Sequence, residues 1–189
     1  MFHDKEKYMQ KRVACHLAPL LGIALYAHFA LAQQDKSKRP SPPASASCKF
    51  ADGKTITVDY SSPRMKGRKI FGELVPYGKV WRAGANEATT FVTNRDLTVG
   101  GKAVPAGSYT MFTIPNENKW TLIISKKTGE WGEPYPGEAD DFARVDMEVS
   151  KLLSPVENFA IAFDQAGGTC TMHLDWETTR ASIAITEKK

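Results

Sequence analysis

The side chains with the widest chemical range are concentrated in residues 61–93, SSPRMKGRKIFGELVPYGKVWRAGANEATTFVT. This stretch mixes cations, glycines, prolines and aromatic residues too irregularly for a helix or a plain strand, and irregular backbone often carries binding and catalytic groups. Its guanidinium forks could bind a carboxylate or phosphate group through paired hydrogen bonds. The arginines concerned are Arg64, Arg68 and Arg82. The alternative is that they pair with nearby acids, namely Asp59, Glu73 and Glu87.

Glu87 is the candidate for carboxylate chemistry, because it follows Asn86 in an irregular turn. It could act as a general acid or base, or accept hydrogen bonds from sugar hydroxyl groups. A glycosidase would need a second carboxyl group at roughly 5–10 Å. The acids of suitable type are Asp59, Asp175 and Glu177. The alternative is that Glu87 is mostly buried and forms a structural ion pair with Arg82 or Arg68, because partly buried acids are usually paired.

Two aromatic residues, Trp131 and Tyr135, lie in residues 128–141, a predicted long loop with three glycines and two prolines. Aromatic rings on such a loop could form a stacking platform for sugar rings, since they are amphipathic and lose little entropy on ordering. We expect the other tryptophans to pack in the core. These are Trp81, Trp120 and Trp176.

Histidine and nucleotide chemistry are both poorly supported. Only His173 lies beyond residue 32, so a site with several histidines cannot form within one chain, and we expect neither a metal nor another cofactor. His173 is out of phase with its apolar neighbours, which predicts an exposed position on a strand rather than a role in a Ser–His–acid triad. No phosphate-binding loop or G-x-G-x-x-G motif is present. The sequence therefore contains no complete catalytic set.

Strands must position these groups, because from residue 48 onward apolar and polar residues alternate between turn signals. Ile56, Val58 and Tyr60 show this alternation, and Gly100-Gly101 marks a hairpin between two short runs. The pattern predicts an all-β domain over residues 48–186. An antiparallel β-sandwich is the first choice and a small β-barrel the second.

Residues 1–32 have the features of a signal peptide: a basic start, a mostly apolar run, and Ala30-Leu31-Ala32 at the end. The alternative is an uncleaved membrane anchor, since roughly 20 residues can span a bilayer. Residues 33–47, QQDKSKRPSPPASAS, are predicted to form a disordered Pro/Ser-rich tether. We therefore expect an exported protein, periplasmic or extracellular, with no membrane span after cleavage.

The charge balance argues against one class of partner. The whole chain has 25 basic and 21 acidic residues. The predicted signal peptide contains four of the basic and two of the acidic ones, so the remaining chain has a net charge of only +2. Nucleic-acid binding is not favoured by that balance.

The chain beyond residue 32 has two cysteines, Cys48 and Cys170. An even number of cysteines in an exported chain suggests a disulfide. Each of the two falls in phase with the apolar residues of a strand-like segment. We therefore predict a Cys48–Cys170 bond, and two unpaired buried thiols are the alternative.

Four motifs occur in this order: SPRMKGRKIFGELVPYGKVWRAGANEATTF, GGKAVPAGSYTMFTIP, KWTLIISKKTGEWG and LDWETTRASI. Together they resemble bacterial domain-of-unknown-function family 2911 over nearly all of residues 48–185. The resemblance implies an exported bacterial domain and agrees with the all-β prediction. It implies no activity and no catalytic or ligand residues, so the functional hypotheses rest on the residues themselves.

Two classes of function remain open. The favoured one is a non-catalytic module that binds a polar ligand, such as an envelope glycan or an anionic small molecule, or that binds another protein. The alternative is a carboxylate-dependent hydrolase that uses Glu87. We expect the central cluster to line a concave surface with an aromatic ring near its rim. The predicted ligand-binding residues are Arg64, Arg68, Arg82, Asn86, Glu87, Trp131 and Tyr135.

Overall fold

The computed structural model describes residues 35–188. Lys36–Lys189 is a compact unit separate from Met1–Asp35, and the fold is that of this unit. The predicted signal peptide and the first two residues of the predicted tether lie outside the described residues. Within the described part, no helix has the length and apolar character needed to cross a membrane.

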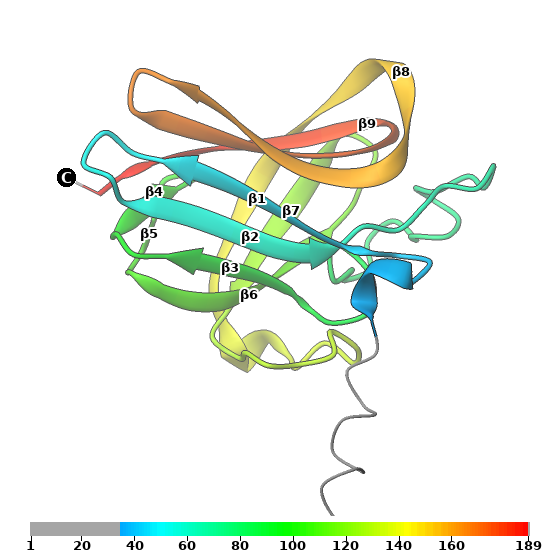
Figure 1. Cartoon of the computed structure of the whole chain (residues 1–189), viewed down its shortest axis with the longest axis horizontal. Coiled ribbons are helices and arrows are strands. Elements are labelled where there is room, and N and C mark those ends of the chain that lie inside the picture. The colour runs from blue at the N-terminus through cyan, green and yellow to red at the C-terminus, as the bar shows by residue number, and fades with distance from the viewer. Residues whose placement is uncertain (1–34, 189) are drawn as a thin grey trace, which may run out of the picture. The chain divides into compact units, whose positions relative to one another are not determined.

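The folded unit is all-β, which confirms the prediction from alternation. Its nine strands form one open antiparallel sheet in the order β1-β2-β3-β6-β7-β8-β9-β4-β5 (Figure 1). The strands are β1 Pro43–Lys49, β2 Thr55–Ser61, β3 Thr89–Thr93, β4 Leu97–Val99, β5 Lys102–Val104, β6 Gly107–Ile114, β7 Lys119–Ser125, β8 Asp141–Ala166 and β9 Thr169–Glu187. The described part also has two 3-10 turns, η1 Lys36–Lys38 and η2 Glu138–Asp140. This architecture is consistent with the predicted sandwich.

The two longest strands, β8 and β9, bend so that the sheet covers its own core. The first part of β8 pairs with β7 and the rest pairs with β9. Their register shifts between Lys151 and Val156 and again between Val156 and Ala160, and such bulges bend a strand. Glu177, the partner of Val156, has a left-handed backbone with φ of 55°. Beyond this bend the β8–β9 hairpin returns alongside β1 (Figure 1).

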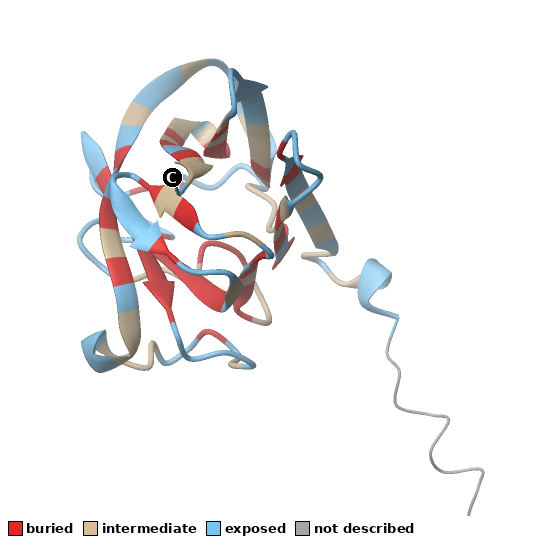
Figure 2. Ribbon diagram, turned by 90° about the vertical axis from the view of Figure 1, so that its left-hand side faces the viewer, coloured by how far each residue is buried: buried red, intermediate tan, exposed pale blue. Residues whose placement is uncertain are grey.

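The interior is filled by aromatic rings from both sides of this bend. Phe71 lies 4.8 Å from Trp120, and Trp81 lies 5.0 Å from Phe159, measured between ring centroids. Trp81 also stacks on Trp176 at 5.9 Å. Edge-to-face and offset pairs of this kind each add about 0.5–1.5 kcal/mol beyond the burial of their area. The three tryptophans expected in the core are therefore packed together there. Figure 2 shows in red where the buried residues lie along the strands.

The predicted tether is wrong for its C-terminal part. Instead of a disordered segment up to residue 47, the structure has β1 from Pro43, with Pro43 opposite Ser61 of β2. Ala44 and Ala46 pack against the core beside Cys48, so alternate small residues give the strand an inner face despite its polar composition. A proline is tolerated at the first position of an edge strand, where its missing N–H costs no sheet hydrogen bond.

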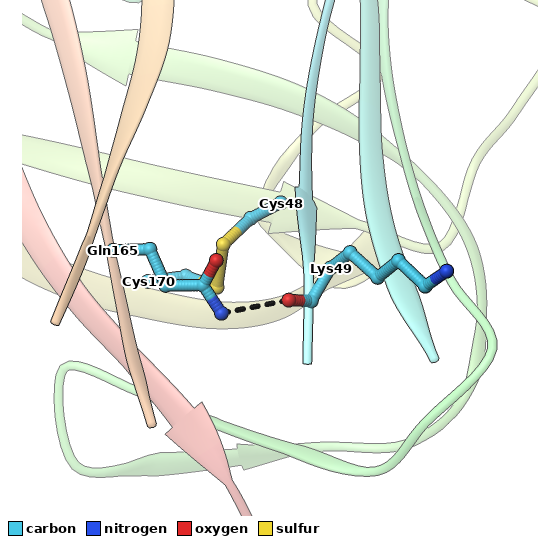
Figure 3. Close-up of a disulfide and its surroundings, with 4 residues drawn as sticks. All are labelled: Cys48, Lys49, Gln165 and Cys170. Carbon is cyan, nitrogen blue, oxygen red and sulfur yellow. Dashed lines mark hydrogen bonds between the residues drawn. A yellow bond between two sulfur atoms is a disulfide. The ribbon is translucent and has the colours of Figure 1, made fainter. Parts of the chain in front are cut away.

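The disulfide predicted from the sequence is present and joins the edge strand β1 to strand β9. Cys48 of β1 is bonded to Cys170 of β9, and both residues are buried. Beside it, the side-chain amide of Gln165 donates a hydrogen bond to the backbone oxygen of Lys49 at 2.7 Å (Figure 3). The covalent bond and the hydrogen bond both link β1 to the β8–β9 hairpin.

Breaking the disulfide should destabilise the fold. The bonded cysteines are 122 residues apart in sequence, for which the chain-entropy model gives about 4–5 kcal/mol, whereas measured values are more often ~2–4 kcal/mol. We expect dithiothreitol to lower the free energy of unfolding by about 2–4 kcal/mol in urea titrations. The variant with Cys48→Ser and Cys170→Ser is the control, because the reductant should not change its midpoint. A wild-type midpoint insensitive to the reductant would contradict the expectation.

Candidate functional site

The irregular chain between β2 and β3 is held in place by backbone hydrogen bonds to β8 and β6. Met65 N–H donates to the backbone oxygen of Glu157 at 2.8 Å, and Phe159 N–H donates to that of Pro63 at 2.9 Å. Further along, Trp81 and Thr113 exchange two hydrogen bonds of 2.7 and 2.8 Å. The stretch is therefore part of the folded unit and not a free loop.

Side chains and unusual backbone angles complete this attachment. A carboxylate oxygen of Glu177 accepts a hydrogen bond from Ile70 N–H at 3.2 Å. Four non-glycine residues of the described chain have positive φ, and three of them lie in this stretch, namely Lys66, Ala83 and Asn86. Left-handed residues other than glycine are costly and often occur at functional sites. The geometry thus marks residues 63–87 as the place to look for a site.

A basic depression lies at the start of the stretch. It has a volume of about 420 Å³ and is lined by Pro40, Ser41, Pro63, Arg64, Lys66 and Arg68. Its walls combine three cations, one hydroxyl group and two proline rings. Pro40 and Ser41 come from the segment before β1, so the depression is formed by two parts of the chain.

Neutral oxygens, not carboxylates, orient the arginines of the basic depression. Arg64 Nη1 donates to the backbone oxygen and to Oγ of Ser62, at 2.9 and 2.8 Å. Arg68 donates from Nε to the backbone oxygen of Met65 at 3.0 Å and from Nη2 to that of Arg64 at 2.6 Å. Among residues 35–188, the ion pairs include no acid within 4.0 Å of the Arg64, Lys66 or Arg68 side chains. The three side chains are therefore not ion-paired, although the Glu157 carboxylate accepts a hydrogen bond from the backbone N–H of Lys66 at 2.8 Å.

The predicted partners of Glu87 are wrong. Its two carboxylate oxygens each accept a hydrogen bond from Arg39 Nη1 at 2.9 Å, and Lys36 Nζ lies 2.9 Å from Oε1. The side chain is 35% exposed, not mostly buried. Hydrogen bonds from Lys36 and then Arg39 lower the pKa of Glu87 to about 2. Glu87 is thus ionised at neutral pH with both oxygens engaged, which suits neither a general acid nor an available base.

Arg82 joins the turn before β3 to the loop after β7. Its Nη2 lies 3.1 Å from Glu133 Oε2, and its Nη1 donates to the backbone oxygens of Asn86 and Trp131, at 2.7 and 3.2 Å. The loop packs closely on it, because a Cβ added to Gly132, which has φ of 91°, would lie only 3.0 Å from Arg82 Cδ. Arg82 is therefore held by the protein itself and is not free to bind a ligand.

Asn86 connects this turn to the basic depression. Its Nδ2 donates to the backbone oxygen of Ser41 at 2.9 Å, and Ser41 also lines the depression. This bond and the Arg39–Glu87 pair attach residues 39–41 to the turn that contains Asn86 and Glu87. Residues 40 and 41 of this segment form one wall of the basic depression. Of the seven predicted ligand residues, Arg64 and Arg68 line the depression, while Asn86 and Glu87 hold the segment that forms its wall.

The two aromatic residues of the predicted platform differ from each other. Trp131 is 56% exposed, whereas the Tyr135 ring packs edge-on against Phe112 at 5.2 Å. Tyr135 Oη donates to Asp141 Oδ1 and accepts from Arg144 Nη2. Burial, and secondly the hydrogen bond to Asp141, raise the pKa of Tyr135 to about 12. Tyr135 therefore covers the outer face of β6 and does not present a free ring.

Two of the three acids proposed as a second catalytic carboxylate have structural roles. Asp175 forms two hydrogen bonds with Arg180, at 2.8 and 2.6 Å, and Glu177 binds the backbone of Ile70. Asp59 is exposed on β2. The described residues contain no group of three or more histidine, cysteine, aspartate or glutamate side chains that could hold a metal ion.

His173 is not exposed as predicted. Only 6% of the residue is accessible, and its Nδ1 lies 3.5 Å from Asp164 Oδ2. Asp175, two residues further along β9, is buried as well. Residues 172–176 are all buried, so both faces of β9 are covered here. The alternation of polar and apolar residues predicted only one covered face.

A larger cavity of about 710 Å³ lies at the C-terminal end of β9. It contains Arg95, but that guanidinium is paired with both Asp52 and Glu187. The basic depression is the better candidate for a charged ligand, because its cations have no such partners. Sequence reasoning missed Arg39, Ser41 and Lys66 as contributors. Lys66 could have been found from its place in the basic run at residues 64–69. No sequence pattern pointed to Arg39 or Ser41.

Comparison with known proteins gives one match. A family model described as protein of unknown function, DUF2911, matches residues 41–185. This agrees with the resemblance seen in the four sequence motifs, and the match also includes the whole of β1. No curated protein matches the chain, and no solved structure matches it.

Glu87→Gln should cost little stability. At neutral pH we expect the free energy of unfolding to fall by about 1 kcal/mol, because solvent screens a partly exposed pair. The pKa of Glu87 is lowered from 4.5 to about 2 on folding, so the stabilisation is complete above about pH 5 and is lost as the pH falls toward 2. Urea titrations at several pH values measure the difference between variant and wild type.

Glu73→Gln is the control for this measurement, because Glu73 lies 3.8 Å from Lys69 and both side chains are largely exposed. We expect this change to have almost no effect. If Glu87→Gln lowered the free energy of unfolding by ~3 kcal/mol or more, the result would contradict a solvent-screened ion pair, because a loss of that size is typical of breaking a buried pair.

Proposed function

The chain belongs to the DUF2911 family of proteins of unknown function, and we propose that its folded unit is a non-catalytic module that binds an anionic ligand. The ligand site is the basic depression. One observation carries the proposal: three cations surround a concave surface, and among the described residues none of their side chains forms an ion pair with an acid. Three like charges held together repel one another, and a bound anion relieves that repulsion.

The lining indicates the chemical class of the ligand. Two guanidinium groups and one ammonium group suit a phosphate or carboxylate group, and Ser41 adds a hydroxyl group. A volume of about 420 Å³ falls in the range of small-molecule sites. A glycan fits this site only if it is acidic, because neither Trp131 nor Tyr135 lines the depression.

The hydrolase alternative has little support. It needs a carboxyl group that can exchange a proton near neutral pH, whereas the pKa of Glu87 is about 2 and both its oxygens are bound by cations. The candidate second carboxylates Asp175 and Glu177 are engaged by Arg180 and by the backbone of Ile70. A binding role requires none of these groups to be free.

We also propose that the protein is exported to the periplasm or beyond. The Cys48–Cys170 bond supports this, because disulfides persist mainly in oxidising compartments. The N-terminal sequence pattern supports it independently.

Pyrophosphate and citrate are the probes for the anion site. A ligand that binds only the folded state stabilises it by RT ln(1 + [L]/Kd), about 2.7 kcal/mol at a hundredfold excess over Kd. We expect both anions to raise the wild-type unfolding temperature, and Lys66→Gln to weaken this rise. The fold should tolerate this change, because the Lys66 side chain is exposed. The triple variant Arg64→Gln, Lys66→Gln and Arg68→Gln should show no rise.

The matched control removes three charges elsewhere, by Lys49→Gln, Lys54→Gln and Lys102→Gln at exposed positions. It has the same net charge as the triple variant and should respond to the anions as the wild type does. An equal response from Lys66→Gln, the triple variant and the control would show that the anions act without the basic depression, and the proposal would fall.

A further inference from the structure

A fully exposed leucine stands near the basic depression. Leu153 lies in β8 between Lys151, which pairs with Thr179, and Val156, which pairs with Glu177. Residues 152–155 between these pairs form a bulge, here called the β8 bulge. Leu153 is the most exposed of the large apolar side chains described. A side chain of this size left wholly in water is informative when it lies next to a candidate binding site.

The β8 bulge and the basic depression belong to the same end of the folded unit. Glu157, four residues after Leu153, accepts the hydrogen bond from Met65 N–H and, through its carboxylate, one from Lys66 N–H at 2.8 Å. Arg64 lies opposite Asn158 in an isolated bridge. Figure 1 shows the bend of β8 and the loop after β2 at the same right-hand end of the unit.

The charge around this end is positive. Lys69 and Lys151 are exposed and add to the three cations of the depression. The acids at this end are Glu73 and Glu157 in residues 63–75 and 151–158, and Glu177, which lies opposite Val156. Five cations against these three acids leave a net charge of +2. Leu74, on the same loop as the cations, is a second exposed apolar side chain.

We propose that this end of the protein docks on an anionic lipid bilayer. Leu153 enters the boundary between headgroups and acyl chains, and the basic depression binds a lipid phosphate group. The inference rests on the proposed anion site and names the source of its ligand. Charge complementarity favours a bilayer, because a negative membrane surface attracts each nearby Lys or Arg by about 1 kcal/mol. An exposed apolar side chain at the same end as a group of cations has the amphipathic character of a surface that lies on a membrane.

The test uses residues 33–189, which contain the whole compact unit Lys36–Lys189. Co-sedimentation is measured with vesicles of phosphatidylcholine containing phosphatidylglycerol, and with vesicles of phosphatidylcholine alone. We expect binding to the anionic vesicles only, with loss at high salt. Lys66→Gln should lower the partition coefficient about fivefold, and Leu153→Ser about tenfold, because a leucine side chain no longer leaves water. Val92→Ser, at an exposed apolar position on β3, is the control and should bind as wild type.

Each outcome decides the inference. Anionic-vesicle binding that Leu153→Ser and Lys66→Gln weaken, but Val92→Ser does not, supports it. Binding that Leu153→Ser leaves unchanged overturns the insertion of Leu153. If pyrophosphate stabilises the protein but the vesicles do not bind, the lipid inference falls while the anion site remains, and this end is then free for a protein partner. If neither pyrophosphate nor vesicles bind, both proposals fall.

Discussion

The candidate site depends on the fold-back of the β8–β9 hairpin over the core. The bend in β8 and β9 brings Phe159 and Trp176 against Trp81, which belongs to the irregular chain after β2. The same strands present Glu157 and Glu177 as acceptors for backbone N–H groups of that chain. Buried backbone groups must be satisfied in this way, so an irregular segment can keep one conformation. The disulfide secures the hairpin from its other end.

The arginines of the central stretch differ in whether a carboxylate pairs with them. Arg82 donates to two backbone oxygens and lies beside a carboxylate, so its donors serve the structure. Arg64 and Arg68 are oriented only by neutral oxygens, which fix a guanidinium group without cancelling its charge. Orientation without neutralisation is what an anion site needs, because an ordered cation loses less entropy when the ligand arrives. Residue type alone does not distinguish these two states.

Local signals in the sequence predict most of the fold but little of the site. Alternation identifies strands because successive side chains in a strand point to opposite faces. For the same reason, Cys48 and Cys170 could be predicted to face inward, since each falls on the apolar side of its strand. The Arg39–Glu87 pair could not be predicted, because its members are 48 residues apart and Arg39 lies in a Pro/Ser-rich segment typical of a tether. Tyr135 was also misleading, since a loop rich in glycine and proline can still fold over the outer face of a sheet. The amino-acid composition of a loop does not show whether it packs against the sheet.

The central claim is that an anion binds among Arg64, Lys66 and Arg68, and amide chemical shifts measured during titration with pyrophosphate test it most directly. The account predicts that the largest changes occur at residues 41 and 64–68, which form the walls of the basic depression. Lys66→Gln should reduce these changes without altering the rest of the spectrum. Changes confined to the larger cavity around Arg95 and Lys188, or spread evenly over exposed lysines, would contradict it.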